Sequence, residues 1–309
     1  MKAISVQNIS KNYAKVAALK GLSFEVEKGE IFGVIGPDGA GKTTLFRILT
    51  TLLLANSGKA SLEGLDVVKD YKKIRQMVGY MPGRFSLYQD LTVEENLKIF
   101  ATVFNTTIQE NYHLIKDIYQ QIEPFKKRRA GALSGGMKQK LALSCALIHK
   151  PNILFLDEPT TGVDPVSRKE FWDMLAKLKE EGITIVVSTP YMDEASLCDR
   201  IALMQGGEFL RIDTPENIMN SYKNILLSVK ADQMSQLLKD LKAYQGLESC
   251  FAFGDSHHIS VDKSSYLEEG DDWKIKLLKY LEYKRHRHIL IEEISATVED
   301  CFMELSEGS

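Results

Sequence analysis

Three short segments of this 309-residue chain hold residues whose types and spacing could do chemistry on phosphate. The first fits the pattern G-x-x-x-x-G-K-[ST], and its residues are Gly36, Pro37, Asp38, Gly39, Ala40, Gly41, Lys42, Thr43 and Thr44. Its glycines let backbone N–H groups surround phosphate oxygens, while Lys42 reaches the β- and γ-phosphates and the Thr43 hydroxyl faces Mg²⁺. A plain Gly-rich turn is the alternative. The apolar run 31–35 and the helical pattern 45–49 supply the strand and helix that a phosphate loop requires.

The second segment is an acidic pair, Asp157 and Glu158, directly after the apolar run 153–156. Such a run predicts a buried strand whose carboxylates emerge at its C-terminal end. Asp157 is then positioned to hold Mg²⁺, directly or through water, and Glu158 to polarise an attacking water. A helix N-cap is the alternative for an isolated acidic pair. Beside a phosphate loop, the pair predicts a chain that binds a nucleoside triphosphate.

The third segment lies between the other two and begins at Leu133. Its polar and small residues are Ser134, Gly135, Gly136 and Gln139, and a helical pattern continues through Leu147. Unpaired N–H groups and the helix dipole at such an N-terminus attract anions. The chain is therefore predicted to carry two separate phosphate-facing surfaces.

The order of these segments resembles the ATP-binding cassette of ABC transporters, over about residues 2–220. In that family the LSGG signature, here residues 133–136, closes over ATP held by the phosphate loop of another cassette, so ATP joins a head-to-tail dimer. The resemblance implies ATP and Mg²⁺ as cofactors, and it implies that Ser134, Gly135, Gly136 and Gln139 contact the partner's ATP. Tyr13 lies where the family stacks an aromatic ring on adenine, and Asp164 lies where its D-loop crosses the dimer axis.

Two positions depart from the family pattern. Gly83 stands where the family usually has a Gln that touches Mg²⁺ and water, and Pro190 stands where it usually has a His that contacts the γ-phosphate. Proline has neither a side-chain donor nor a backbone N–H. Since transition-state contacts of this kind each contribute a few kcal/mol, their loss predicts slow turnover at the site built on Lys42.

A site shared between two chains makes this loss asymmetric. The opposite site would use only Ser134, Gly135, Gly136 and Asp164 of this chain. We therefore expect a heterodimer with a complete cassette, in which hydrolysis occurs mainly at the other site. A homodimer with two slow sites is the competing hypothesis. A regulatory cassette that dimerises on ATP and hardly hydrolyses it is the alternative function.

Composition agrees with a two-domain, cytoplasmic protein. The formal net charge is -3 and the sequence pI is about 6.1, so no overall basic field favours nucleic acid. The basic run 126–129 is predicted to be a solvated loop. No apolar stretch approaches the roughly 20 residues that span a bilayer, and residues 1–2 lead into a strand pattern rather than a secretory signal. Four dispersed cysteines predict reduced, mostly buried thiols.

Alternating strand and helix patterns predict an α/β core. The resemblance implies that this core is a P-loop NTPase cassette at residues 1–220, with the family's helical subdomain at about 84–145. Within it, 92–121 shows helical spacing and begins with a capping-box pattern. Residues 221–309 are predicted to form a small α+β accessory domain. Their order of elements, β-α-β-β-α-β plus a last helix at 297–305, suggests a ferredoxin-like fold. Histidines 257, 258, 286 and 288 are expected at the surface and not at a metal.

The resemblance also implies partners. The tail at 296–305 resembles that of exporter-type cassettes described as multidrug or lipid-linked efflux ATPases. A separate membrane permease is required, and half of the large side chains in the segment 85–91 are expected to form the surface that receives it. The chain would then lie on the inner face of the cell membrane. Cassettes of DNA repair or of ribosomes are the other class, but the long coiled-coil insertion and the tandem cassettes of those proteins are missing from this sequence.

Overall fold

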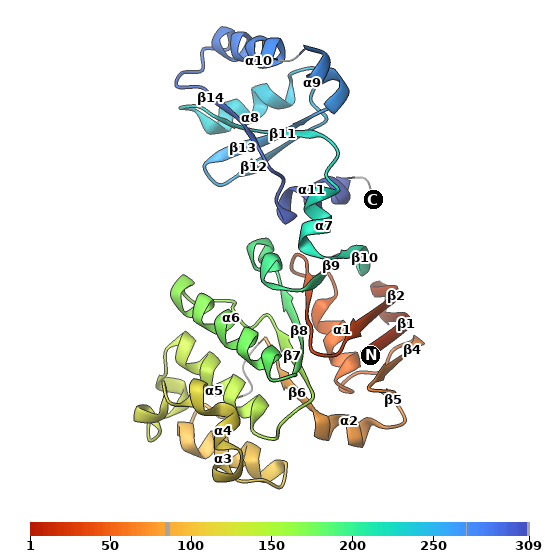
Figure 1. The fold of residues 1–309 in the computed structure, drawn as a ribbon, viewed down its shortest axis with the longest axis vertical. Coiled ribbons are helices and arrows are strands. Elements are labelled where there is room, and N and C mark those ends of the chain that lie inside the picture. Colours follow the sequence, from red (N-terminus) through yellow and green to blue (C-terminus); the bar gives the residue numbers. More distant parts are fainter. Residues whose placement is uncertain (84–86, 270, 308–309) are drawn as a thin grey trace. The chain divides into compact units, whose positions relative to one another are not determined.

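The computed structural model describes residues 1–83, 87–269 and 271–307 (Figure 1). The chain divides into two compact units, Met1–Thr214 and Pro215–Ser309. The sequence placed this division after residue 220. The difference arises because helix α7 (Pro215–Asn220) packs against α11 (Val298–Glu307) and so belongs to the second unit.

The first unit is built on a six-stranded, mostly parallel sheet with the order β10-β9-β3-β8-β7-β6. Its strands are β3 (Ile31–Ile35), β6 (Val78–Met81), β7 (Ile153–Asp157), β8 (Thr184–Thr189), β9 (Arg200–Gln205) and β10 (Glu208–Asp213). Only β10 pairs antiparallel with its neighbour. Every residue of β3 and of β7 is buried, as expected for strands covered on both faces. The parallel sheet places the C-terminal ends of these strands at one edge, where an α/β protein binds its ligands.

A second, antiparallel sheet of the first unit has the order β2-β1-β4-β5. Its strands are β1 (Lys2–Tyr13), β2 (Val16–Glu27), β4 (Ser57–Leu62) and β5 (Leu65–Asp66). The hairpin of β1 and β2 ends where Tyr13 pairs with Val16. Phe24 of this sheet stacks on Phe32 of β3, with ring centroids 5.5 Å apart, so the two sheets share one apolar core.

The α-helices of the first unit, within the described residues, are α1 (Lys42–Leu49), α2 (Tyr71–Met77), α3 (Val93–Val103), α4 (Ile108–Tyr119), α5 (Gly135–Leu147) and α6 (Pro165–Glu180). The predicted capping box at the start of α3 is confirmed, with Thr92 and Glu95 bonded reciprocally. The helical stretch 92–121 is two helices, because Asn105 has a φ of +54° and Thr107 begins a second capping box. These helices form the subdomain between the phosphate loop and the signature.

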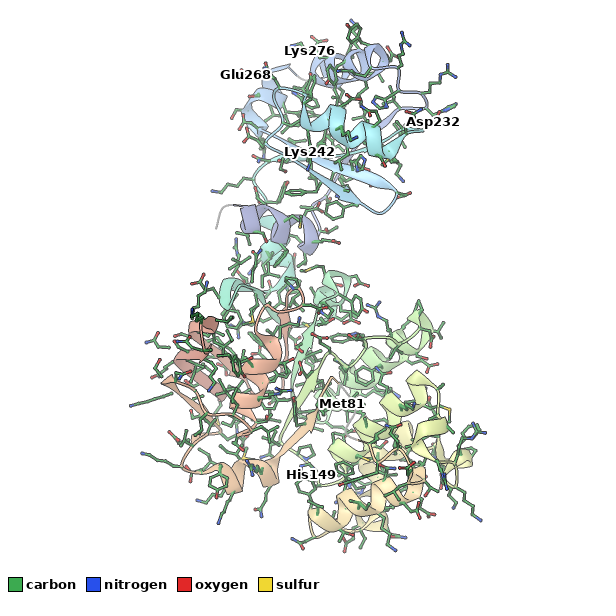
Figure 2. The ribbon with its side chains drawn as sticks, turned by 180° about the vertical axis from the view of Figure 1, so that it is seen from behind. Met81, His149, Asp232, Lys242, Glu268 and Lys276 are labelled. Carbon is green, nitrogen blue, oxygen red and sulfur yellow. The ribbon has the colours of Figure 1, made fainter. Side chains whose placement is uncertain are left out.

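The second unit contains a four-stranded antiparallel sheet with the order β12-β13-β11-β14. Its strands are β11 (Ile225–Lys230), β12 (Ser249–Phe253), β13 (Ser256–Val261) and β14 (Leu290–Ile294), and its further helices are α8 (Met234–Lys242), α9 (Lys263–Glu269) and α10 (Asp271–Tyr283). The strands and helices follow in the predicted order, with α9 as an additional helix. Exposed charged side chains such as Asp232, Lys242, Glu268 and Lys276 cover its surface (Figure 2).

The expected surface position of the histidines is wrong for two of them. His257 is 5 % exposed with Nε2 2.7 Å from the Met234 carbonyl, and His286 is 8 % exposed with Nε2 3.0 Å from Asp240. Each buried ring has its Nε2 hydrogen-bonded to a partner far away in sequence, and Nδ1 of His257 is buried without a hydrogen-bond partner. Among the described residues no group of three or more His, Cys, Asp or Glu could hold a metal ion.

The cysteines and the helices agree with the sequence analysis. All four cysteines are buried. In the part of the chain that the structure describes, no helix has both the length and the apolar character needed to cross a membrane.

Candidate functional site

The phosphate loop connects β3 to α1 in a conformation that only its glycines permit. Gly41 has a φ of +113°, and a Cβ there would lie 2.5 Å from the Ala18 carbonyl oxygen. A Cβ on Gly36 would lie 2.1 Å from the Met204 carbonyl oxygen. Neighbouring backbone therefore presses directly on the loop, and side chains at these two positions would displace it.

Lys42, the first residue of α1, lies inside this loop and is only 3 % exposed. Its ammonium donates to the carbonyl oxygens of Gly36 at 2.8 Å and Pro37 at 3.0 Å. It also forms an ion pair with Glu158 at 3.1 Å. A desolvated cation is thus fixed between the loop and the acidic pair, where it can bind a phosphate group.

A pocket brings most of the predicted ATP-binding residues together. It is lined by Tyr13, Ala18, Gly39, Gly41, Lys42, Thr43, Thr44 and Glu158. The Tyr13 side chain is 44 % exposed, with the Lys11 ammonium 5.7 Å from its ring centroid. A partly open aromatic ring at one side of a phosphate pocket has the position needed to stack on a base.

The two carboxylates at the end of β7 differ in exposure. Asp157 is 2 % exposed and accepts a hydrogen bond of 2.7 Å from Ser188 Oγ, whereas the Glu158 side chain is 24 % exposed. Glu158 has a φ of +50°, and its N–H donates to Ser188 O at 3.0 Å. Ser188 therefore fixes both acidic residues. No sequence motif predicts this role of Ser188. Its place near the end of β8, the strand beside β7, was a usable signal for a contact with the acidic pair.

Tyr80 approaches Asp157 from the opposite neighbouring strand. The tyrosine hydroxyl interacts with the carboxylate of Asp157 and the guanidinium of Arg47. Burial, and then the nearby negative charge of Asp157, raise the pKa of Tyr80 to about 12. The hydroxyl thus keeps its proton and can donate it to the carboxylate in a hydrogen bond. Asp157 and the Thr43 hydroxyl together offer hard oxygen donors, the type that suits Mg²⁺.

Both departures from the family pattern lie at this site. A Cβ on Gly83 would be 3.0 Å from Asp157 O and 3.8 Å from Glu158 Cβ, so position 83 adjoins the acidic pair. Pro190 directly follows Thr189, the last residue of β8 and the acceptor of the Gly36 N–H at 3.2 Å. Residues 84–86 lie outside the described part of the chain.

The signature segment forms the exposed N-terminal end of α5. Ser134 is its N-cap, accepting a hydrogen bond of 3.3 Å from the Met137 N–H. Gly136 packs so closely that a Cβ there would lie 2.8 Å from Ser167 Oγ. Asp164 caps the adjacent α6 through a 3.0 Å bond from the Ser167 N–H, which holds the pKa of its carboxyl below the usual value. The signature and the D-loop thus form one surface.

Gln139 does not lie on this surface. It is fully buried, and its Nε2 donates to the Pro159 carbonyl at 2.8 Å. The prediction that it contacts the partner's ATP disagrees with this position. Gln139 instead connects α5 to the turn that follows the acidic pair, because the first turn of α5 directs it inward.

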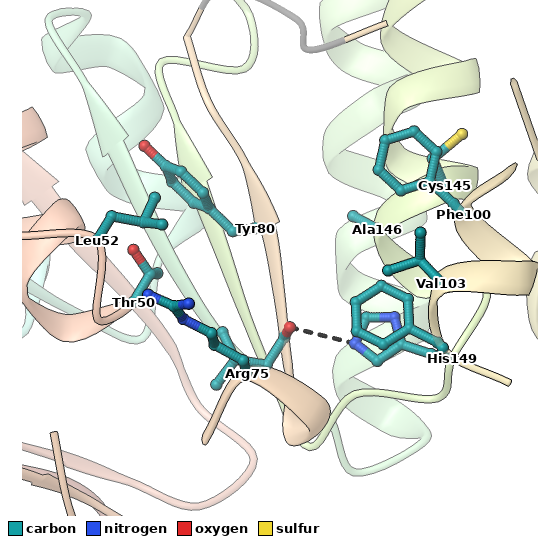
Figure 3. Close-up of a pocket in the computed structure, with 11 residues that line it drawn as sticks. Thr50, Leu52, Arg75, Tyr80, Phe100, Val103, Cys145, Ala146 and His149 are labelled. Carbon is teal, nitrogen blue, oxygen red and sulfur yellow. Dashed lines mark hydrogen bonds between the residues drawn. The ribbon is translucent and has the colours of Figure 1, made fainter. Parts of the chain in front are cut away.

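A half-open groove lies between the sheet and the helical subdomain (Figure 3). It is lined by Thr50, Leu52, Arg75, Val78, Tyr80, Phe100, Val103, Phe104, Cys145, Ala146 and His149. His149 stacks on Phe104 with centroids 3.7 Å apart, and its Nε2 lies 3.1 Å from the Val78 carbonyl. Leu52 and Val103 are 56 % and 68 % exposed. Of the segment expected to receive a permease, Phe85 and Ser86 are outside the described residues, Leu87 is buried and Tyr88 is 53 % exposed.

A loop of this form, an acidic pair whose first carboxylate is buried and a mainly parallel sheet define a P-loop nucleotide-binding protein. Residues 19–161 match the family described as "ABC transporter". The chain is 41 % identical over 217 residues to the probable multidrug ABC transporter ATP-binding protein YbhF of Escherichia coli (strain K12), covering 70 % of this chain and 38 % of that protein. It is 38 % identical over 221 residues to the Nod factor export ATP-binding protein I of Burkholderia lata, covering 71 % of this chain and 73 % of that protein.

A solved structure agrees with these relatives. The dimeric post-hydrolysis state of the ATP-binding cassette MJ0796, bound to ADP and Pi, gives a TM-score of 0.63 at 26 % identity and covers 68 % of this chain and 98 % of its own. The chain therefore belongs to the ABC transporter family, as an ATP-binding cassette, and cassettes of this family are the ATPases of transporters. The first relative is considerably longer, since the match spans little more than a third of it.

Proposed function

We propose that this chain is the ATP-binding and ATP-hydrolysing subunit of an ABC exporter, and that ATP-driven pairing of cassettes powers a separate membrane permease. One observation carries this proposal: a pocket around Lys42 and a separate, exposed helix end at Ser134 and Gly135 exist on the same chain. Each has half of the groups that a shared nucleotide site needs. The names of the relatives, which describe export and multidrug transport, support the direction of transport.

In this proposal the pocket binds ATP through the loop from Gly36 to Thr44, with Tyr13 stacked on the adenine. Thr43 and Asp157 would hold Mg²⁺, which would neutralise charge on the phosphates when bound. Ser188 and Tyr80 keep the Asp157 carboxylate in place. Glu158 would accept a proton from the attacking water, after release from its ion pair with Lys42.

The site built on this chain's own loop would turn over slowly. Gly83 and Pro190 have no side-chain group to replace the usual Gln and His, and both adjoin the acidic pair or the phosphate loop. The signature surface, by contrast, keeps Ser134, Gly135 and Gly136. We therefore favour a heterodimer with a complete cassette over a homodimer with two slow sites.

The groove at Leu52 and Val103 is the proposed contact with the permease, on the inner face of the cell membrane. Its apolar rim and the stacked rings of Phe104 and His149 suit a short helical segment presenting apolar side chains. The chain belongs to the ABC transporter family, and no described helix of it can span the bilayer. Both facts support a segment of a separate permease as the occupant of the groove.

ATP-dependent association tests the shared nucleotide site. In a Glu158→Gln background, which slows turnover, we measure sedimentation of the chain alone and with candidate partner cassettes, with and without ATP. Ser134→Arg and Lys42→Ala are each expected to weaken association at least about tenfold, the effect of one lost charge-assisted contact. Thr107→Arg is the control, because Thr107 is also an exposed helix N-cap with a 3.2 Å bond. Unchanged association of both variants would overturn the proposal.

Gly83 and Pro190 also favour a second candidate, a regulatory cassette that dimerises on ATP with little hydrolysis. Vanadate traps nucleotide only at a site that cycles. For the exporter subunit, trapping is expected in the pair with a complete partner cassette, mainly at the site built on the partner's phosphate loop. No trapping on either chain of a stable pair would favour the regulatory cassette.

A further inference from the structure

A carboxylate outside the nucleotide pocket connects several of its supporting segments. Glu194 lies in the 3₁₀ helix Met192–Leu197 and is 2 % exposed. Its Oε2 accepts hydrogen bonds from Thr189 Oγ1 at 2.6 Å and Thr160 Oγ1 at 3.1 Å, and its Oε1 lies 3.0 Å from the Arg168 guanidinium. A buried charge with three partners holds their segments in one geometry, since each partner would otherwise lose a charge-assisted bond.

From Glu194 the contacts continue to the phosphate loop. Thr189 accepts the Gly36 N–H at its carbonyl, at 3.2 Å, and the Gly36 carbonyl in turn accepts the Lys42 ammonium at 2.8 Å. A second connection passes through the acidic pair, because Thr160 is followed by Thr161, whose N–H donates to Glu158 O at 3.3 Å. Glu158 pairs with Lys42 at 3.1 Å. Both routes end on the same ammonium.

In the other direction the contacts reach the surface of the D-loop. Arg168 lies one turn into α6, whose N-cap is Asp164, and its N–H donates to the Asp164 carbonyl at 2.9 Å. The guanidinium also stacks over the Tyr191 ring at 4.2 Å, which fixes the turn just after Pro190. The Arg168–Glu194 pair therefore joins the start of α6 to the turn that contains Pro190.

We propose that Glu194 is a positioning residue that couples the D-loop end of α6 to the phosphate loop, so that contact of a partner cassette with one changes the other. This inference rests on the proposed ATP-driven pairing. Pro190 has no donor of its own to offer a γ-phosphate, so the effect of this turn on the site is proposed to pass through Thr189 and Gly36. Glu194 keeps the contact between Thr189 and Gly36 in place.

Amide hydrogen exchange and nucleotide affinity of the full-length chain test the coupling. Glu194→Gln keeps the shape but removes the charge that binds Arg168. We expect exchange of the segment 36–42 to accelerate, and the affinity for a non-hydrolysable ATP analogue to fall, each about two- to thirtyfold. Glu30→Gln is the matched control, because Glu30 is 9 % exposed and paired with Arg200 at 3.1 Å in the same unit. It is expected to change neither quantity.

Thr189→Val provides a second variant, which removes the hydroxyl that donates to Glu194 and accepts the Tyr191 N–H at 3.1 Å. The same acceleration in residues 36–42 is expected, while strands β1 and β2 keep their protection. If Glu194→Gln and Thr189→Val both behave like Glu30→Gln, Glu194 only stabilises the fold and the proposed coupling is wrong. Failure of the proposed function would be seen in a different measurement. In that case Ser134→Arg would associate like the unmodified chain, regardless of the rate of amide exchange at Gly36.

Discussion

The pocket around Lys42 and the helix end at Ser134 are both proposed to bind phosphate, yet they are built differently. The pocket draws on β1, β2, the phosphate loop, α1 and the residue directly after β7, and its cation is almost completely buried. The signature end is a single exposed helix terminus whose serine is occupied with its own N-cap bond. The first can bind a nucleotide alone, whereas the second offers N–H groups that become a site only against another surface.

This difference shows which of the two surfaces a substitution affects. The two departures, Gly83 and Pro190, both lie on the pocket side, beside Asp157 and after Thr189. Nothing comparable has changed at Ser134, Gly135 or Gly136. In the proposed function, one chain therefore combines a weakened site of its own with an intact contribution to a partner's site.

Restoring the missing groups is expected to have the largest effect. Gly83→Gln combined with Pro190→His should raise ATP hydrolysis by at least about a hundredfold, since single transition-state donors are each worth that much. The new Cβ at position 83 lies 3.0 Å from Asp157 O, so a small shift of the segment is required. Phosphate release checks the rate, with Glu158→Gln in the restored chain as the control. No gain would mean that the departures do not explain the asymmetry.

Removal of the buried cation is expected to act on the pocket alone. Lys42→Ala should weaken ATP binding roughly 10- to 100-fold, because it deletes a charge-assisted contact and leaves Glu158 without its 3.1 Å partner. Isothermal titration with a non-hydrolysable analogue measures the change. Lys20→Ala, a surface lysine 3.9 Å from Glu208, serves as the control. Equal affinity of the Lys42 variant would contradict the pocket assignment.

Tyr13→Ala is expected to have a smaller effect that depends on the base. The ring is half-exposed, so loss of stacking should cost about five- to tenfold in ATP affinity, and little in affinity for inorganic triphosphate. Comparing these two ligands separates stacking from a general change of the loop. A similar loss for both ligands would indicate that Tyr13 supports the loop rather than the base.

The smallest effect is expected at the helix end. Ser134→Arg should leave the affinity of the isolated chain for ATP within about twofold, since the residue does not line the pocket. The same titration measures it. A loss of ATP affinity as large as that of Lys42→Ala would show that Ser134 belongs to the chain's own nucleotide site. The two surfaces could then not be treated as separate.

Sequence patterns predicted the parts of the site that local chemistry determines. The loop from Gly36 to Thr44 and the strand before Asp157 follow from glycine geometry and from burial on both faces. Ser188 and Glu194 could not be found this way, because their partners come from other segments of the chain. Gln139 was misassigned for a related reason: a helix face that turns inward looks the same in sequence as one that turns outward.

In the second unit, too, the sequence does not predict contacts between distant segments of the chain. Its strands follow from alternating apolar residues, but the burial of His257 and His286 depends on acceptors at Met234 and Asp240, which only the folded unit brings near. Helix α9 is short and carries no strong periodic pattern, so it was not predicted.

Steady-state ATP hydrolysis by the purified, unmodified chain is the most direct measurement. The isolated chain can pair only with a second copy of itself, which gives two weakened sites. It should therefore hydrolyse ATP slowly even when ATP saturates the pocket. Brisk turnover that disappears in Glu158→Gln would show that Gly83 and Pro190 leave the site fully active, and the account of an asymmetric cassette would be wrong.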